Sequence, residues 1–498
     1  MERKSNLVYY KEYIILKNMK KPFYLTTTLP YVNAPLHIGH ALEFIRADTI
    51  VRYKKLLGYD VFFNTGTDEH GVKIYEKAKE NDLSPEDFVN KSFETFKEQL
   101  KIFNLYSNVH YIRTTDEHHI KAAQEFWKIV EKNGYIYKKN YQAKYCIGCE
   151  DEKTESELVN GECPDHPGIP LKLIDEENYF FKYTAFQDKL LNFYKENPNF
   201  VIPDFRFNEI KNFVSNGLQD FSISRLKEKM PWGISVPGDD NQVMYVWFDA
   251  LTNYISTLGW PEDMENFNKY WRDGNPTQYC GKDNNRFQSA MWQAMLMAAN
   301  LPNSKQIVIN GHVTGEGGIR MSKTLGNVVD PRDIANKYGV DALRYFLLKE
   351  VSSFEDSPFT MDRFKDSYNS GLVNGLGNLT SRILTMSSNY EVKLSEEDLN
   401  TKYYTGPVEE LETFDICKQM DNIWKDISDL NKFIQDKEPF KKIKIDKEEA
   451  EKDVYYLLKH LHGVALALEP MMTETSLKIQ ELIKENKKPE SPLFPRVD

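Results

Sequence analysis

The fold class is decided by the stretch PFYLTTTLPYVNAPLHIGHALEFIRADTIVRYKKLLGYDVFFNTGTDEHG, residues 22–71. Its beginning, PFYLTTTLPY, is aromatic and β-branched and predicts a strand. An apolar-rich helical pattern follows from about residue 38 to 57 and ends at Gly58, a residue type typical of a helix C-cap. The segment DVFFNTG predicts a second strand that closes on TGTDEHG. This strand–helix–strand order, with polar residues after the strands, indicates an α/β fold with a doubly wound, Rossmann-like parallel sheet.

Composition and charge limit the classes of protein that remain. The chain has 498 residues, of which 41% are hydrophobic and 13% aromatic, as expected for a globular protein of several domains. The net charge of −11 argues against indiscriminate nucleic-acid binding, although it allows a local basic groove for one RNA. We find neither an apolar run of membrane-spanning length nor a signal peptide, so we expect a cytoplasmic protein without a membrane partner. Either Met1 or Met19 could be the native start.

Two histidines, His37 and His40, stand three residues apart at the start of the predicted helix. They share one helix face, where unpaired backbone N–H groups and the helix dipole already favour an anion. Gly39 between them allows a ligand to approach the backbone. The pair is suited to binding phosphate, but the spacing alone is equally compatible with structural or solvated histidines.

A second candidate segment follows the predicted strand QIVINGHV, residues 306–313. The glycine-rich loop TGEGGIRMSKTLGN carries Lys323, which is flanked by Ser322 and preceded by Arg320. A mobile lysine of this kind can close over polyphosphate and stabilise charge in a transition state. Considered alone, a basic pair in a loop is more often a solvated surface feature.

Together, PLHIGH and RMSKT resemble the HIGH and KMSKS signatures of class I aminoacyl-tRNA synthetases. The blocks LPYVNAPLHIGHALEF, TGTDEHG, YIRTTDEHH, GLQDFSISR, VPGDDNQVMYVWFDALTNYIS, YCGKDNNRF and RMSKTLGNVVDP resemble methionyl-tRNA synthetases from about residue 22 to 450. SPLFPRVD is similar to the end of that family's short form, without an appended dimerisation domain, so we expect a monomer. The spacing of the signatures leaves little room for a large editing domain. The alternatives are a class I synthetase of other specificity, such as cysteine, or a non-catalytic tRNA-binding relative.

Cys146 and Cys149 form one short knuckle, and Cys163 and His166 form a second. This Cys3His spacing suits a tetrahedral structural zinc ion with no open coordination position. A redox-active Cys-x2-Cys pair is the weaker alternative. The resemblance identifies the segment as the zinc knuckle of the connective insertion.

The resemblance also implies the substrate sites. Methionine binding would involve Leu29, Tyr31, Asp68, Arg225, Trp247, Ala250, Leu251, Tyr254 and Gln288, with Asp68 on the substrate ammonium and Arg225 on its carboxylate. The family usually has histidine at the position of Gln288, and an aromatic stripe such as VWFDALTNY would by itself indicate core. ATP, with Mg²⁺, would be bound by His37, Gly39, His40, Gly281, Asp283, Arg320, Ser322 and Lys323, of which His37, His40 and Lys323 would be catalytic. Arg320 and Thr324 replace the first lysine and last serine of the family signature.

Anticodon contacts would be made by Asn378, Arg382 and Phe440, the last at a position where the family usually stacks a tryptophan. Without the resemblance, Asn378 and Arg382 would be ordinary surface residues of a helical bundle. The implied reaction is ATP-dependent ligation of L-methionine to tRNA(Met) through methionyl-adenylate, which supports translation. We predict six segments: an N-terminal tail (1–21), the first half of a Rossmann catalytic domain (22–120), a connective insertion with the zinc knuckle (121–230), the second half of the catalytic domain (231–330), a stem-contact linker (331–361) and an all-α anticodon-binding domain (362–498).

Overall fold

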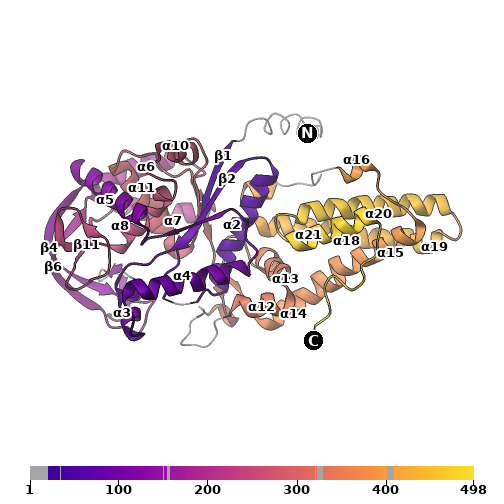
Figure 1. Cartoon of the computed structure of the whole chain (residues 1–498), viewed down its shortest axis with the longest axis horizontal. Helices are drawn as coiled ribbons and strands as arrows, with labels where there is room; N and C mark the ends of the chain where they lie inside the picture. The colour runs from indigo at the N-terminus through magenta and orange to yellow at the C-terminus, as the bar shows by residue number, and fades with distance from the viewer. Residues whose placement is uncertain are drawn as a thin grey trace. The chain divides into compact units, whose positions relative to one another are not determined.

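The computed structural model describes residues 21–33, 35–149, 151–153, 157–319, 321, 329–400 and 409–497. The chain forms two compact units, coloured by residue number in Figure 1. Unit 1 comprises the described residues within Met1–Pro35, Leu57–Leu100 and Ser107–Ile309. Unit 2 comprises those within Leu36–Leu56, Lys101–Tyr106 and Asn310–Asp498. The six segments drawn from the sequence stay predictions.

A six-stranded sheet organises unit 1. The strand order is β3 (Val109–Arg113), β2 (Asp60–Thr67), β1 (Pro22–Thr26), β12 (Thr277–Gly281), β13 (Gln306–Asn310) and β7 (Val201–Ile202). Strand β1 pairs in parallel with β2, where Pro22 faces Asp60, and also with β12. Strand β2 pairs in parallel with β3, and β13 with β7. The predicted doubly wound parallel sheet is therefore confirmed, and its order changes direction between β1 and β12, where such sheets bind ligands.

The segment between the two halves of this sheet is antiparallel. Strands β4 (Ile136–Cys146) and β6 (Lys172–Phe181) pair along ten positions, from Ile136 opposite Phe181 to Tyr145 opposite Lys172. The short strands β5 (Asp151–Lys153) and β8 (Phe221–Ser222) flank this pair. A separate three-stranded sheet contains β10 (Ser235–Val236), β11 (Asp239–Met244) and β9 (Ser224–Leu226). Strands β4, β5, β6, β8 and β9 lie within the predicted insertion, residues 121–230, whereas β10 and β11 lie beyond it, and the bounds of the insertion stay a prediction.

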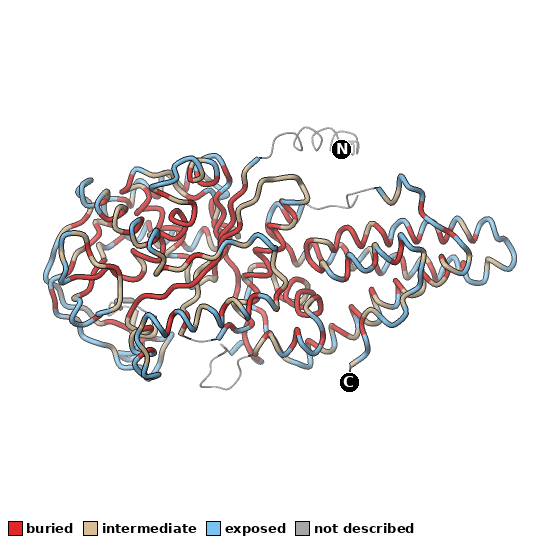
Figure 2. The backbone as a smooth tube through the Cα atoms, viewed as in Figure 1, coloured by how far each residue is buried: buried red, intermediate tan, exposed pale blue. Residues whose placement is uncertain are grey.

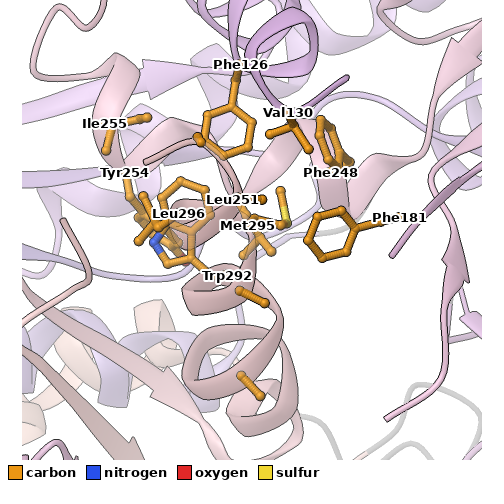
Figure 3. Packing of buried hydrophobic residues seen from close by; sticks show 14 of the residues in the cluster. Phe126, Val130, Phe181, Phe248, Leu251, Tyr254, Ile255, Trp292, Met295 and Leu296 are labelled. Atoms are coloured by element: carbon orange, nitrogen blue, oxygen red, sulfur yellow. The ribbon is translucent and has the colours of Figure 1, made fainter. Parts of the chain in front are cut away.

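The core of unit 1 is unusually aromatic. Helices α5 (Glu117–Lys132), α8 (Val246–Ala250) and α11 (Trp292–Ala298) contribute Phe126, Phe248 and Trp292 to one cluster of buried residues (Figure 3). The rings of Phe126 and Trp292 stack with centroids 5.7 Å apart, and those of Phe126 and Phe248 meet edge to face at 5.8 Å. Strands β1 and β2 are buried over most of their length (Figure 2). Burial of these large rings is the main source of stability expected for this unit.

Unit 2 is mainly helical. It contains α2 (Ile38–Leu56), the helix that carries the first signature. Helix α2 ends shortly before Gly58, whose backbone φ is positive, at 87°. Beyond residue 310 it contains α12 (Pro331–Tyr338), α13 (Val340–Tyr345), α14 (Met361–Ser367), α15 (Asn378–Tyr390), α18 (Ile416–Lys437), α19 (Pro439–Lys442), α20 (Lys447–Leu468) and α21 (Thr473–Glu485). The predicted helical C-terminal part is confirmed, although helices already begin at Pro331. Among the described residues, no helix combines the length and apolar character needed to cross a membrane.

Candidate active site and metal centre

The carboxyl ends of β1 and β12 bring two of the predicted segments to neighbouring positions in unit 1. Leu29 and Tyr31 follow β1, and Gly281 ends β12, two residues before the exposed Asp283. Tyr31 forms a parallel β-bridge with Asp68, and the Asp68 N–H donates to the Pro30 carbonyl oxygen at 3.1 Å. Asp68, at the end of β2, is only 5% exposed. Backbone pairing therefore holds Asp68 beside Tyr31 at the ligand-binding edge of the sheet.

A buried carboxylate fixes the strand end that carries Asp68. The next residue, Glu69, is fully buried and receives two hydrogen bonds from Arg113, from Nε to Oε1 and from Nη2 to Oε2, both at 2.9 Å. Thr67 Oγ1 donates to Glu69 Oε1 at 2.7 Å, and Trp232 Nε1 donates to the Glu69 carbonyl oxygen at 2.6 Å. Because a bidentate Arg–carboxylate pair is geometrically specific, it restricts the position of the adjacent Asp68.

Sequence reasoning missed a second buried network at this edge. Asp249 Oδ2 lies 2.7 Å from His70 Nδ1, and Asp249 Oδ1 lies 3.0 Å from His119 Nε2. His119 Nδ1 lies 2.8 Å from Ser256 Oγ. Burial acts to raise the pKa of the Asp249 carboxyl, but the charge of His70 and the hydrogen bonds from both histidines outweigh it, so the pKa is lowered. The sequence does contain an indication of this network: Asp249 lies within the otherwise apolar stretch VWFDAL, where a buried carboxylate needs polar partners.

Aromatic side chains form a wall next to Tyr31. Tyr145 and Tyr245 are buried in one small cluster, against which Tyr31 and Trp247 pack. The Arg225 guanidinium lies 5.2 Å from the ring centre of Tyr145 and 4.6 Å from that of Tyr245. Arg225 is buried, and its Nη1 donates to the carbonyl oxygen of Ser224 at 2.8 Å. The structure thus brings Tyr31, Trp247 and Arg225 together around shared aromatic neighbours.

The remaining predicted methionine contacts lie between this wall and the main core. Trp247 stacks on Phe287 with ring centres 3.8 Å apart and an interplanar angle of 4°. Leu251 and Tyr254 are 1% and 2% exposed and belong to the aromatic core (Figure 3), as a helical stripe by itself would indicate. Ala250 is also buried. Gln288 Nε2 donates to the Tyr254 hydroxyl oxygen at 2.5 Å, so the sequence departure at 288 lies in direct contact with the predicted pocket.

The four predicted metal ligands converge. Their ligand atoms all lie within 4.8 Å of one another, with Cys149 Sγ 3.5 Å from Cys163 Sγ and 3.2 Å from His166 Nδ1. Cys146 Sγ lies 3.8 Å from His166 Nδ1. A Cβ added at Gly148 would lie 2.4 Å from the His166 ring, so this position requires glycine for the knuckle to close. Three thiols and one imidazole around one point fit tetrahedral ligation of a single metal ion.

The signature histidines begin α2 in unit 2. Their rings stack with centres 3.9 Å apart and an interplanar angle of 26°. The N–H groups of His40 and Ala41 donate to the His37 carbonyl oxygen at 3.0 and 3.1 Å, which forms the first helical turn. A Cβ at Gly39 would lie 3.0 Å from His37 Cε1, so glycine leaves this ring its space. His37 is exposed, and the pair presents imidazole nitrogens at a helix N-terminus, where an anion is favoured.

A backbone hydrogen bond connects the two signature regions. The Ile38 N–H, inside the first signature, donates to the carbonyl oxygen of Val329 at 3.2 Å. Val329 follows the RMSKT segment closely in the sequence. The predicted ATP ligands Arg320, Ser322 and Lys323 lie outside the described residues. Val329, five residues after Thr324 in the sequence, therefore lies against the start of the helix that carries the first signature.

Comparison with known proteins supports the family resemblance seen in the sequence along nearly the whole chain. The family model described as tRNA synthetases class I (M) matches residues 23–169 and 168–384. A methionine–tRNA ligase of Caldanaerobacter subterraneus subsp. tengcongensis is 40% identical over 481 residues, covering 93% of this chain and 74% of that protein. The chain belongs to the methionine–tRNA ligase family. Another member of this family, from Brucella suis biovar 1, is 36% identical over 93% of this chain and 92% of its own length.

Solved structures of the methionine–tRNA ligase family share the fold. The Mycobacterium tuberculosis methionyl-tRNA synthetase in complex with methionyl-adenylate has a TM-score of 0.87 and 33% identity, covering 96% of this chain and all of that one. The apo form of the same enzyme has a TM-score of 0.80 and 32% identity. Because each of these structures covers 96% of this chain, the likeness extends over both units.

The residues predicted to contact the anticodon in this methionine–tRNA ligase family member lie on two helices of unit 2. Asn378 and Arg382 stand one turn apart on α15. Arg382 Nη1 donates to Asn431 Oδ1 on α18 at 3.2 Å. Phe440, on the short helix α19, is 42% exposed. Their role in binding RNA stays a prediction, and the exposure of Phe440 leaves its ring available for stacking.

Proposed function

We propose that this chain ligates L-methionine to tRNA(Met) in two steps. A methionine carboxylate oxygen attacks the α-phosphorus of ATP, and pyrophosphate leaves as methionyl-adenylate forms. A terminal ribose hydroxyl of tRNA then attacks the activated carbonyl carbon, its proton is lost, and AMP leaves. The observation that carries the proposal is the Ile38–Val329 hydrogen bond, which holds a residue that follows the RMSKT segment against the first signature in a chain of the methionine–tRNA ligase family.

The phosphates would be held by side chains from both signatures. His37 and His40 would donate from Nε2, since the backbone N–H groups of Gly39 and His37 donate to His37 Nδ1 and His40 Nδ1 at 3.1 and 3.3 Å, and Lys323 would add a positive charge where the triphosphate becomes more negative. Arg320 and Ser322 would assist Lys323, and Gly39 would let ATP approach the backbone. Mg²⁺ would enter with ATP, bound mainly through phosphate and water oxygens. No side-chain nucleophile is required, so positioning and electrostatics would provide the rate.

Methionine would occupy the carboxyl-end edge of the sheet in unit 1. Asp68, held by the Tyr31 bridge, would pair with the substrate ammonium, and Arg225 with its carboxylate. Leu29, Tyr31 and Trp247 would form the walls, and Ala250, Leu251, Tyr254 and Gln288 would enclose the thioether. Gly281 and Asp283, at the end of the neighbouring strand, would contact the ATP ribose.

The metal in the knuckle would be zinc in a structural role, because four protein ligands leave no position for substrate. The ion would stabilise the fold of the knuckle. We expect purified protein to contain one zinc per chain by elemental analysis, and Cys149→Ser to lose it and unfold at a lower temperature. The matched variant Cys417→Ser, on α18 in unit 2, should keep its zinc. Full zinc content in Cys149→Ser would contradict this assignment.

Anticodon bases of tRNA(Met) would contact the helical part of unit 2. Single-stranded bases are read by stacking and by hydrogen bonds to their edges, which Phe440 and the Asn378–Arg382 pair can supply. Since phenylalanine offers a smaller face than tryptophan, we expect a weaker stack at this position.

The catalytic assignment is tested by methionine-dependent ATP–pyrophosphate exchange. Lys323→Ala should lower the exchange rate by about 10²–10³-fold, the usual cost of one well-placed charge-stabilising donor. The control is Lys337→Ala, which removes an exposed lysine from the last turn of α12 and should leave exchange unchanged. Unchanged exchange in Lys323→Ala would refute the role of this lysine.

A further inference from the structure

Arg46, on the helix that carries the first signature, is bonded to a loop that lies about three hundred residues further along the chain. Its side chain is 1% exposed, and its Nη1 donates to Asn310 Oδ1 at 3.1 Å and to the Ser353 carbonyl oxygen at 3.0 Å. Its Nη2 donates to the carbonyl oxygens of Val351 and Ser352 at 2.9 and 2.7 Å. These four acceptors are uncharged. Because a guanidinium presents its donors in a rigid plane, Arg46 fixes the loop relative to α2.

The loop held by Arg46 is tied in turn to the residues that follow it. The Ser352 N–H donates to Ser357 Oγ at 3.0 Å, and the Glu355 N–H donates to Ser352 Oγ at 3.2 Å. A Cβ added at Gly311 would lie 2.2 Å from the Glu355 carbonyl carbon, so the two backbones are in direct contact and position 311 requires glycine. The position set by Arg46 is therefore passed on along this loop to residue 357.

A short parallel strand pair then connects the loop to the chain that leads to RMSKT. Strand β15 (Ser357–Pro358) pairs with β14 (Val313–Thr314), and the Ser357 N–H donates to the His312 carbonyl oxygen at 3.0 Å. Strand β14 continues into the glycine-rich loop that precedes RMSKT in the sequence. All of these residues belong to unit 2. Arg46 thus holds, through β15, the strand from which the chain enters the second signature.

Helix α2 is connected to the chain on both sides of RMSKT. After this segment, the carbonyl oxygen of Val329 accepts from the Ile38 N–H at 3.2 Å. Before it, the connection runs through Arg46 and β15. Ile38 and Arg46 are eight residues apart on α2, about 12 Å at 1.5 Å per residue. One helix, which begins at the signature histidines, therefore fixes the chain on either side of the second signature.

We propose that Arg46 is a positioning residue for adenylate formation, which sets where the chain enters RMSKT relative to His37 and His40. The inference rests on the proposed function, because it takes the ATP triphosphate as the ligand shared by the two signatures. Arg46 would not touch the substrate. Small misplacements of catalytic groups have large effects on rate, up to about 10²-fold for 1 Å. The predicted methionine contacts are in unit 1 and do not take part in this connection.

The test measures methionine-dependent ATP–pyrophosphate exchange, with kcat expressed per active site counted by active-site titration. Arg46→Met has a side chain of similar length without donors, and its kcat should fall about tenfold. Its KM for methionine should stay within about twofold of the wild-type value. Arg46→Lys keeps the charge but not the planar fork, so its kcat should fall about threefold. General destabilisation would lower the number of active sites and leave the kcat of each unchanged.

The matched control is Arg52→Met, on the same helix. Arg52 Nε pairs with Asp48 at 2.8 Å and Nη2 donates to the Asn104 carbonyl oxygen at 2.7 Å, and neither bond leads to β14 or β15. This variant should keep the wild-type kcat per active site, even if it melts at a lower temperature. A kcat in Arg52→Met as low as in Arg46→Met would overturn the inference.

Hydrogen exchange provides a second measurement that does not depend on activity. The Phe359 N–H donates to the Thr314 carbonyl oxygen at 2.8 Å, beside the Ser357 bond, and both amides should exchange faster in Arg46→Lys but not in Arg52→Met. If Arg46→Met fails to fold, Arg46→Lys carries both tests. The inference is overturned if Arg46→Lys keeps the wild-type kcat or the wild-type exchange at these amides. Absence of methionine-dependent exchange in the wild-type protein would instead overturn the proposed function, and the inference with it.

Discussion

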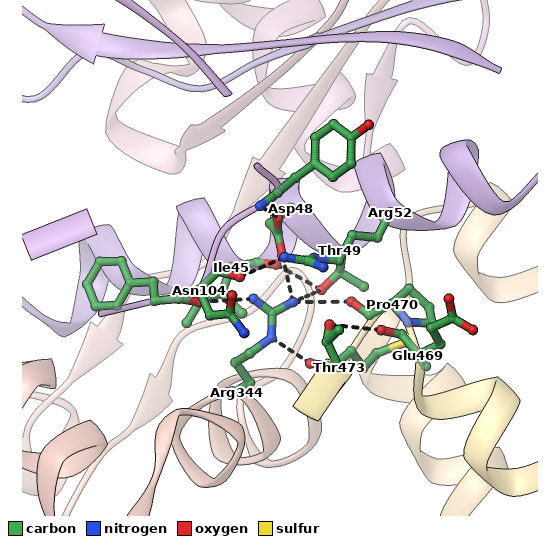
Figure 4. A network of polar contacts seen from close by, with 12 residues as sticks. Ile45, Asp48, Thr49, Arg52, Asn104, Arg344, Glu469, Pro470 and Thr473 are labelled. Carbon is green, nitrogen blue, oxygen red and sulfur yellow. Dashed lines mark hydrogen bonds and ion pairs between the residues drawn. The ribbon is translucent and has the colours of Figure 1, made fainter. Parts of the chain in front are cut away.

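Two buried polar networks, a neutral one in unit 1 and a charged one in unit 2, can be compared. In unit 1 a series of hydrogen bonds, which we call the amide relay, connects the neutral side chains of Gln293, Ser304, Gln278, Gln288 and Tyr254. In unit 2 the Arg344 guanidinium, 1% exposed, lies 2.8 Å from the fully buried carboxylate of Asp48 (Figure 4). Arg344 Nε also donates to the Met471 carbonyl oxygen at 2.6 Å, and Nη2 to that of Pro470 at 3.1 Å. Asp48 accepts a further bond from Arg52 Nε at 2.8 Å.

The difference shows what each kind of network achieves. The charged network joins α2, α13 and the turn before α21, so it holds the signature helix to segments that are remote in sequence. Its attraction is strong, and removing Arg344 leaves the buried Asp48 with the partly exposed Arg52 as its charged partner. The amide relay binds less strongly, but each amide has a donor end and an acceptor end, so the relay transmits an orientation.

The largest effect is expected from the charged network. Arg344→Met should lower the free energy of unfolding by about 3–5 kcal/mol in urea, because the buried Asp48 loses one of its two arginine partners and two carbonyl oxygens lose their donor. The control is Arg332→Met, whose guanidinium pairs with Asp330 at the partly exposed start of α12, and it should cost under about 1 kcal/mol. If both variants lost the same free energy of unfolding, the buried Arg344–Asp48 pair would stabilise the fold no more than the partly exposed Arg332–Asp330 pair.

A smaller loss of stability is expected from the neutral relay. Gln278→Leu should cost about 1–3 kcal/mol, because the Gln288 oxygen and the Ser304 hydroxyl lose their partner inside the core. Gln306→Leu, in neighbouring β13, removes only an exposed bond to the Asn199 carbonyl oxygen and should cost about 0.5 kcal/mol or less. A loss in Gln278→Leu as large as in Arg344→Met would contradict the distinction between the two networks.

The smallest effect is expected at a surface ion pair. Lys459, 2.7 Å away, and the hydroxyls of Tyr455 and Ser395 lower the pKa of Asp398 from 3.8 to about 2. A lowered carboxyl pKa stabilises the folded state above pH 3.8, and this contribution is lost as the pH falls toward 2. Solvent screening limits it to about 1 kcal/mol, so Asp398→Asn should be less stable by that amount at pH 7.

The same two variants compared at pH 2 provide the check on Asp398. Thermal unfolding should then show a much smaller difference, because at pH 2 the wild-type carboxyl is about half protonated when folded and almost fully protonated when unfolded, so most of its contribution is lost. A stability difference that stays constant between pH 7 and pH 2 would show that the substitution acts through something other than this charge.

The sequence predicts features that depend on local pattern. Alternating strand and helix signals indicate the parallel sheet, Gly58 marks the end of α2, and two short Cys/His spacings predict the metal ligands. Placement of α2 in unit 2 could not be predicted, because its buried partner Arg344 lies far away in the chain. The relay was missed for a related reason: glutamine is common on surfaces, and only the fold places Gln278 and Gln288 in contact.

The central claim is that this protein activates methionine with ATP. Its most direct test is ATP–pyrophosphate exchange by the purified wild-type chain with each of the standard amino acids in turn. We expect exchange with methionine at a kcat/KM far above that of any other amino acid. Exchange driven by a different amino acid, or by none, would contradict it.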